Sequence, residues 1–341
     1  MHAAVTTTFL HRTASTAALV ATLGAATAQA QQPVAQSSAA AASVRADAEQ
    51  FLRRGDRTSA VELLGRWLSE HPTDGASWSQ LGRIYLADGQ RWHREGHLLD
   101  PDGMLLLEFA SAAFEQAQQL LVDSGTVYRV LVAVEQMLIR LEAAGWEATM
   151  INNPLAAEQL PLPPVLAELG ANLIASCPVN GVLVTGSLVE TAAVWGTRLG
   201  YSSRDDLILV RPDMYGWDAA YRVRMAEALG VPLDQELPAA LATVATRRPV
   251  CLTPAVDSIT APALAWRPLH LVLASSPASD STTAELTVHQ LASTGLAGSV
   301  WSSAVRDVYD LAARRNRGLC LTLLAAGDSP GLPSIAACPR E

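Results

Sequence analysis

The stretch Ala60–Tyr85, AVELLGRWLSEHPTDGASWSQLGRIY, decides how the N-terminal half of this chain folds. On both sides of Pro72, apolar residues recur three or four positions apart, which is the spacing of one buried helix face. Proline cannot easily continue a helix, so we expect one helix to end at Pro72 and a second to begin at an Asp74 cap. The stretch therefore predicts two consecutive helices with a tight turn between them.

Eight residues of this stretch stand at the offsets of a tetratricopeptide repeat, a unit of two packed helices. They are Ala60, Leu64, Trp67, Pro72, Trp78, Leu81, Gly82 and Tyr85. The domain that we expect over 44–150 thus resembles the tetratricopeptide family, with Trp67 where Ala is usual and an insertion from Gln90 to Leu105. The resemblance implies helical hairpins that hold a protein partner and carry no chemistry of their own.

The insertion is the part of this half that we expect to contact a partner, because loops added to a rigid repeat often carry function. His93 and His97 lie four residues apart, a helical spacing at which two rings can share a metal ion. Arg94 stands where a metalloprotease helix needs Glu, and a third ligand must come from elsewhere, so we expect no metal. The expected partner-binding residues are Trp92, His93, His97, Leu98 and Leu99.

The N-terminus has the pattern of a secretory signal peptide. An Ala/Thr-rich apolar run follows Arg12, and Ala28-Gln29-Ala30 has the small-x-small form of a cleavage site. We expect a signal peptide over 1–30, a disordered Gln/Ala/Ser tether over 31–43, and export to the periplasm. Every later apolar stretch is interrupted well short of the ~18 residues that a membrane span needs, so we expect no transmembrane segment.

Charge and cysteine content narrow the class of partner. The 341 residues carry a formal net charge of −9, and an acidic balance without basic runs argues against a nucleic-acid partner. In an oxidising compartment four cysteines permit two disulfides in any of three pairings, and buried free thiols are the alternative. The cysteines are Cys177, Cys251, Cys320 and Cys338.

A Pro-rich linker over 151–165 precedes a second domain that we expect over 166–341. In this domain short apolar runs alternate with helical patterns, which predicts an α/β fold with a small parallel or mixed sheet flanked by helices. The predicted strands are Gly181–Thr185, Asp206–Val210, Pro249–Leu252 and Leu269–Ala274.

The carboxyl ends of these strands form the candidate ligand cleft, because α/β sheets bind ligands at that edge. The loop 185–187 can present a helix N-terminus to an anion, but one Gly-Ser pair also suits a structural turn in which Ser187 caps the helix. We expect no catalytic residue and no cofactor. The candidate cleft residues are Thr185, Ser187, Glu190 and Arg211.

The second domain is also similar to the soluble tail of DUF2723-type, O-mannosyltransferase-like bacterial membrane proteins. The matching segments are Val182–Thr191 with Trp195, Arg204–Val210, Pro249–Thr253, Trp266–Leu273 and Leu323–Asp328. Ser187 replaces the acidic residue that the family usually has after Gly186. The family's membrane-embedded transferase part has no counterpart here, so the resemblance implies an accessory domain without activity.

These patterns predict an exported, non-enzymatic interaction protein, a peripheral periplasmic subunit that binds an inner-membrane complex through its helical hairpins. The alternative is an envelope glycan-binding protein or enzyme that uses the α/β cleft. An empty cleft near Thr185 and Arg211 would favour the alternative, and a flat or filled surface there would favour the interaction protein.

Overall fold

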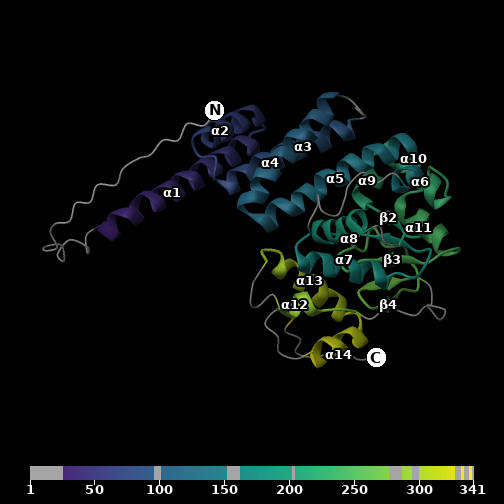
Figure 1. Cartoon of the computed structure of the whole chain (residues 1–341). Coiled ribbons are helices and arrows are strands. Elements are labelled where there is room, and N and C mark those ends of the chain that lie inside the picture. The colour runs from purple at the N-terminus through teal and green to yellow at the C-terminus, as the bar shows by residue number, and fades with distance from the viewer. Residues whose placement is uncertain are drawn as a thin grey trace, which may run out of the picture.

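The computed structural model describes residues 26–95, 101–151, 162–201, 204–275, 286–293, 299–326, 332–333 and 338–339. Within these residues the chain forms fourteen helices and five strands. Figure 1 shows the first five helices in a row above a body that contains the sheet. The C-terminal half has the mixed sheet flanked by helices that the strand patterns predict.

The helical half consists of two hairpins and a further long helix. The first hairpin is α1 (Ala26–Arg53) with α2 (Arg57–Glu70), and the second is α3 (Gly75–Arg94) with α4 (Pro101–Leu120). The long helix α5 (Val122–Ala144) packs against α3 and α4, and α6 (Trp146–Ile151) follows it. The described residues of the insertion therefore lengthen α3 and α4 instead of forming a loop of their own.

Asp74 caps α3, as the sequence predicts. Its carboxylate accepts hydrogen bonds from the Ser77 N–H at 3.2 Å and from Trp67 Nε1 at 2.9 Å. Arg45 donates to both carboxylate oxygens, at 3.1 and 3.0 Å. One side chain thus satisfies the start of α3 and ties α1 and α2 to it.

The segment 31–43, which we expect to be a disordered tether, lies within α1 instead. Figure 1 shows the N-terminal part of α1 extending away from the rest of the molecule. Four consecutive alanines, Ala39–Ala42, favour helix by intrinsic propensity even without an apolar face to bury. Residues 1–25 of the expected signal peptide lie outside the described residues.

The sheet has five short strands in the order β2-β1-β3-β5-β4. The parallel part consists of β1 (Val182–Val184), paired with β2 (Ile208–Val210) on one side and with β3 (Val250–Leu252) on the other. The antiparallel part consists of β5 (Val272–Ala274), which lies between β3 and β4 (Arg267–Leu269). Every residue of β1, β2 and β3 is buried, as their apolar runs predict.

The predicted strand Leu269–Ala274 is part of a hairpin instead. His270 adopts a positive φ of 48° and turns the chain between β4 and β5. Turns of this kind usually carry Gly or Asn, whose absence here makes Leu-His-Leu-Val look like one continuous strand.

Helices flank the sheet and connect its strands. The pair α7 (Pro164–Ser176) and α8 (Leu188–Tyr201) pack against each other, and α8 also contacts α5. The connection from β2 to β3 consists of α9 (Pro212–Trp217), α10 (Ala219–Leu229) and α11 (Leu237–Ala245). The last helices are α12 (His289–Ser293), α13 (Ser302–Ala313) and α14 (Arg317–Ala325), and the first two of these contact α7.

One hydrophobic core joins the two halves. Val130, Val134 and Leu138 of α5 belong to the same buried cluster as the strands β1, β2 and β3. Two smaller clusters lie among the first five helices. The helical half is therefore packed onto the α/β half and is not joined to it by the chain alone. Residues 152–161 of the expected linker lie outside the described residues.

All four cysteines form disulfides, Cys177–Cys251 and Cys320–Cys338. The first connects the end of α7 to β3, and the second connects α14 to the C-terminal segment. Two disulfides fit an oxidising compartment. Among the described residues we find no helix with the length and apolar character of a membrane span.

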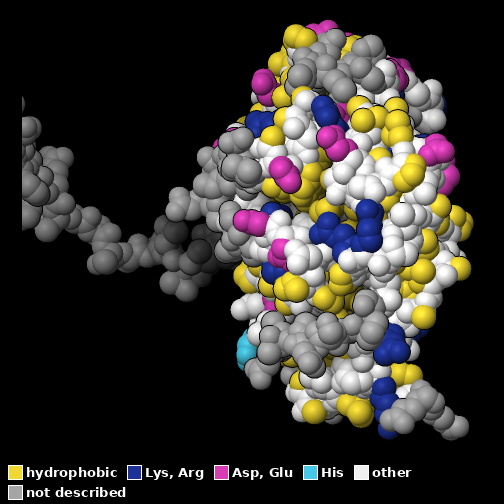
Figure 2. Space-filling view, turned by 90° about the vertical axis from the view of Figure 1, so that its right-hand side faces the viewer, with side chains coloured by type: hydrophobic (Ala, Val, Ile, Leu, Met, Phe, Trp, Pro, Cys, Tyr) yellow, Lys and Arg dark blue, Asp and Glu magenta, His cyan; other side chains and the backbone are white. Residues whose placement is uncertain are grey.

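Charges of both signs mix on the surface. Figure 2 shows Arg side chains grouped near the centre of one face, with Asp and Glu side chains near them. A broad pocket beside α6 has the same mixture, because Arg224 and Arg248 line it together with Asp205, Asp206 and Glu227. Cationic and acidic groups thus offset each other on these surfaces.

Removal of the Cys177–Cys251 disulfide should destabilise the protein more than removal of Cys320–Cys338. The sequence separations are 74 and 18 residues, and a longer closed loop restricts the unfolded chain more. We expect the Cys→Ala double variants to lose about 4 and about 3 kcal/mol respectively. Urea unfolding under oxidising conditions measures both. A larger loss for the short loop would contradict this explanation.

Candidate functional site

A cleft opens at the carboxyl ends of the parallel strands, where the strand order reverses. The chain runs from β1 to β2 on one side of β1 and then returns to β3 on its other side, and the loops that follow the three strands line the cleft. The cleft has a volume of about 590 Å³, within the range of small-molecule sites. This is the edge at which the sequence places the candidate cleft.

Both halves of the molecule line this cleft. The helical half contributes Gln90 of α3 and Leu131 of α5. The α/β half contributes the loops after β1, β2 and β3, and their polar lining residues are Thr185, Ser187, Arg211, Asp213, Asp257 and Thr260. The shape of the cleft therefore depends on how the two halves are placed.

Glu190 lies beneath the cleft and not in its lining. Its fully buried carboxylate accepts hydrogen bonds from the N–H groups of Gly186 (3.1 Å), Ser187 (2.9 Å) and Ala255 (3.0 Å). The Thr253 hydroxyl donates to it as well, at 2.8 Å. Glu190 thus holds the loop after β1 against the loop after β3. It also occupies the N–H groups that an anionic ligand would use at the start of α8.

Gly186 is the point at which these two loops touch. A Cβ at this position would lie 2.2 Å from backbone atoms of Ala255 and Val256. Its N–H also donates to the Thr253 hydroxyl oxygen at 3.0 Å. A residue with a side chain would push the loops apart, so the close approach requires glycine.

Arg211 connects the cleft to a buried cluster of ionisable side chains. It pairs with Asp213 at the cleft, and its Nη1 lies 3.9 Å from Glu135 Oε2. Gln90 Nε2 donates to the same Glu135 oxygen at 3.2 Å. Burial lowers the pKa of Arg211, but Asp213 and Glu135 outweigh this effect and raise it, so the guanidinium stays charged.

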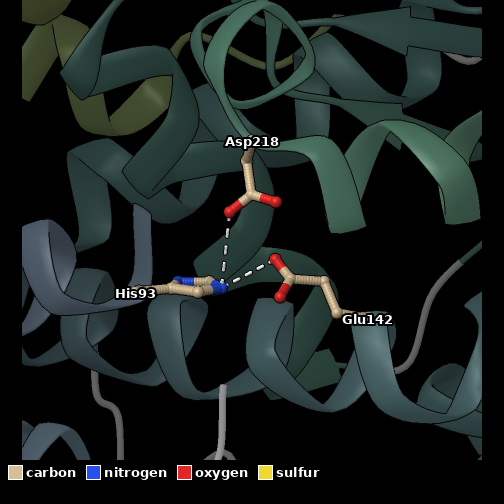
Figure 3. Close-up of side chains that lie close together, drawn as sticks. All are labelled: His93, Glu142 and Asp218. Atoms are coloured by element: carbon tan, nitrogen blue, oxygen red, sulfur yellow. Dashed lines mark hydrogen bonds and ion pairs between the residues drawn. The ribbon is translucent and has the colours of Figure 1, made fainter. Parts of the chain in front are cut away.

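His93 lies at the centre of this buried cluster. Its Nδ1 lies 2.6 Å from Glu135 Oε1, and its Nε2 lies 2.7 Å from Glu142 Oε1 and 3.6 Å from Asp218 Oδ2. None of the four side chains is more than 5% exposed. Figure 3 shows His93, Glu142 and Asp218 converging from different elements, so the cluster joins α3 and α5 to the start of α10.

The carboxylates favour a positive charge at the His93 ring. Burial lowers the pKa of His93, but hydrogen bonds and attraction from Glu135 and Glu142 outweigh it and raise the pKa well above its usual value. For Glu142, burial raises the pKa and His93 opposes this, while the nearby Asp218 raises it further. Glu142 and Asp218 therefore compete for the positive charge that one ring nitrogen can offer.

The predicted partner-binding residues do not form one exposed surface. His93 is buried in the cluster, and the Trp92 ring packs against α4, where it would meet a Cβ at Gly103. The reason is that α3 continues as a regular helix to Arg94, so its inner face meets α4 and α5. His97, Leu98 and Leu99 lie outside the described residues.

Three of the four predicted cleft residues line the observed cleft, and the fourth lies beneath it. Thr185, Ser187 and Arg211 line the cleft, and Glu190 supports its loops from below. Thr253 was missed, although it follows a predicted strand directly, at the position to which the carboxyl-end rule points. Glu135 and Glu142 were also missed. They are buried two turns apart on α5 among apolar neighbours. Acidic residues at apolar positions of a helix pattern indicate a buried polar site, and this signal is visible in the sequence.

Gly186→Ala should destabilise the protein by roughly 2 kcal/mol or more, because the added methyl group overlaps backbone atoms. Gly65→Ala is the matched control. This glycine is exposed on helix α2 and a methyl group added there would have no neighbouring atom within 4 Å, so we expect a gain of about 0.5–1 kcal/mol. Thermal and urea unfolding measure both variants. Equal stability of the two would rule out the tight contact between the loops.

No protein-family model, curated protein or solved structure matches this chain. The resemblances to the tetratricopeptide family and to the DUF2723-type tail therefore stay predictions. What the chain does has to be inferred from the cleft and from the buried cluster beside it.

Proposed function

We propose that this chain is an exported binding protein that holds a neutral, polyhydroxylated ligand, such as a fragment of an envelope glycan, in the cleft after β1, β2 and β3. The observation that carries the proposal is the open cleft of about 590 Å³ between Thr185 and Arg211. An interaction scaffold without a ligand would have a flat or filled surface at this edge.

The lining groups suit sugar hydroxyls. Ser187 and Thr260 carry hydroxyls, Gln90 an amide and Asp257 a carboxylate. Ser187, Gln90 and Asp257 each make a hydrogen bond within the protein and keep further donor or acceptor capacity. Leu131, Leu188 and Val256 add apolar surface between these groups. Scattered polar groups on a partly apolar wall match a molecule that presents both hydroxyls and C–H faces.

The charges of the cleft favour a neutral ligand. Arg211 already pairs with Asp213, and the N–H groups at the start of α8 are bonded to Glu190. A phosphate or carboxylate ligand needs free cationic groups or free N–H groups. In this cleft an anion would have to compete with carboxylates that are already in place.

Export is supported by two independent features. The sequence has a signal-peptide pattern before residue 31, and both disulfides fit an oxidising compartment. A periplasmic location would give the cleft access to envelope glycan fragments.

Leu188→Arg should weaken ligand binding by about tenfold or more, since a long charged side chain would enter the cleft from its rim. Leu188 is 46% exposed, so the substitution should leave the core intact. Leu321→Arg is the matched control, because Leu321 is similarly exposed on α14, away from the cleft lining.

Ligand affinity is measured by calorimetric titration. The ligands are neutral oligosaccharide fragments, phosphorylated sugars and nucleotides. We expect neutral fragments to bind to the wild type and to Leu321→Arg, and weakly to Leu188→Arg. Binding of phosphorylated compounds alone, or no binding at all, would contradict the proposal.

A second candidate function is protein binding by the helical half, as the tetratricopeptide resemblance implies. It is favoured by two exposed apolar side chains one turn apart on α4, Leu105 and Phe109. Phe109 also lies beside Tyr85 of α3, with ring centroids 5.4 Å apart. These rings give the second hairpin an exposed apolar patch that is unrelated to the cleft.

Phe109→Ser should abolish recovery of a membrane partner if this patch binds one. The measurement is affinity purification of the tagged mature protein from gently solubilised envelopes, followed by mass spectrometry. Leu324→Ser is the control, since Leu324 is equally exposed, at 45%, on α14. Recovery of the protein alone, or of the same partner with Phe109→Ser, would contradict a binding role for the patch.

A further inference from the structure

Three metal-ligating side chains from three elements meet in the buried cluster. His93 lies near the end of α3, Glu142 near the end of α5, and Asp218 directly before α10. One ligand atom from each lies within 4.8 Å of the ligand atoms of the other two (Figure 3). All three residues are buried, so a bound ion would be shielded from water.

The spacing of the donor atoms is close to that of a single-ion site. Donors that bind Zn²⁺ at ~2.0–2.1 Å in a tetrahedral site lie ~3–3.5 Å from one another. Asp218 Oδ2 lies 3.6 Å from His93 Nε2, whereas Glu142 Oε1 lies at a hydrogen-bond distance of 2.7 Å and would have to move back to admit an ion. One imidazole nitrogen and two carboxylates form a donor set that divalent first-row transition metals accept.

Glu135 and its neighbours orient the His93 ring for such a role. Glu135 Oε1 lies 2.6 Å from Nδ1 and can accept its proton, which would leave Nε2 to bind an ion in place of its 2.7 Å hydrogen bond to Glu142. Gln90 and Arg211 hold the other Glu135 oxygen. Metal-binding histidines almost always have a partner of this kind on their second nitrogen.

An unsatisfied oxygen points independently to a missing partner. Glu142 Oε2 is buried and has no hydrogen-bond partner among the described residues. A buried carboxylate oxygen without a donor costs free energy that native structures rarely leave uncompensated. A metal ion bound to Glu142 would satisfy this oxygen directly or through a coordinated water.

A bound cation would also suit the carboxylates of the cluster. Glu142 and Asp218 both face His93 Nε2, at 2.7 and 3.6 Å. A divalent ion in place of a proton on this nitrogen would offer positive charge to both carboxylates at once, and burial of unpaired charge is strongly unfavourable.

We propose that His93 Nε2, Glu142 and Asp218 bind one divalent transition-metal ion, best matched by Zn²⁺, which fastens α3 and α5 to α10. The burial of all three ligands makes this a structural site, without access for a substrate. The proposal does not rest on the proposed function, since the ion lies beside the cleft and not in its lining.

The test is metal content and affinity in the purified mature protein, with Zn²⁺ and Mn²⁺ as probes. After chelator treatment and reloading, we expect about one Zn²⁺ per chain by elemental mass spectrometry. Zn²⁺ at about 100 times its dissociation constant should raise the unfolding temperature by roughly 5 °C or more, and Mg²⁺ should not.

Variants locate the site. Glu142→Gln and Asp218→Asn should lose Zn²⁺, and Glu135→Gln should weaken its binding by about 10- to 100-fold by freeing the ring. Glu227→Gln is the matched control, because Glu227 is an exposed carboxylate on the same helix as the Asp218 cap and pairs only with Arg224 among the described residues. Equal Zn²⁺ content in Glu142→Gln and Glu227→Gln would overturn the site.

The ring nitrogens of His93 give a measurement in the wild type, independent of whether any variant folds. In ¹⁵N-labelled protein loaded with Zn²⁺, we expect one protonated nitrogen and one metal-bound nitrogen. Two protonated nitrogens, together with no retained Zn²⁺ or Mn²⁺, would overturn the proposal and assign the positive charge to an imidazolium between Glu135 and Glu142.

Discussion

The buried ionic cluster around His93 is the interaction on which the placement of the two halves depends. Transfer of each of its charged groups from water costs several kcal/mol, and only close partners offset that cost. His93, Glu135 and Glu142 belong to the helical half, and Asp218 and Arg211 reach them from the α/β half, at 3.6 Å from His93 and 3.9 Å from Glu135. The apolar contacts of α5 tolerate small shifts, whereas a shift of the halves that separates Arg211 from Glu135 leaves buried charges without their partner. The hydrophobic core thus supplies most of the attraction between the halves, and the cluster selects their register.

The shape of the cleft depends on how the helical half and the α/β half are placed, because both line it. Gln90 and Arg211 both contact Glu135 in the cluster and both line the cleft, so the wall from the helical half and the wall from the sheet are held by the same carboxylate. On the opposite side, Glu190 draws the loops after β1 and β3 together by accepting four hydrogen bonds. This internal carboxylate makes the start of α8 unlike a phosphate-binding loop. Its position explains why the Gly-Ser turn, which suggests an anion site in sequence, has its N–H groups already bonded in the folded protein.

Local patterns were enough to predict most of the elements. The spacing around Pro72 and Asp74 places two helices correctly. A Cβ at Gly82 would lie 2.7 Å from the Phe114 ring, so α3 and α4 cross closely at this repeat position. The apolar runs at β1, β2 and β3 are recognisable because both faces of these strands are buried. Predictions failed where the local signal was absent. The turn at His270 lacks Gly or Asn, and the segment 31–43 joins α1 by alanine propensity without a periodic apolar face.

The candidate site was harder to predict because its contacts are distant in sequence. His93 meets Glu135 and Glu142 across 42 and 49 residues, and no spacing rule within the insertion contains that information. His97 stands at helical spacing from His93 in the sequence, whereas the observed partners of His93 lie on α5. The one local trace is a conflict of patterns: Glu135 and Glu142 occupy positions on α5 that should be apolar by periodicity. An acidic residue is retained on a buried helix face only if something positive meets it there. Such conflicts therefore indicate a polar site more reliably than pairs of histidines at a familiar spacing.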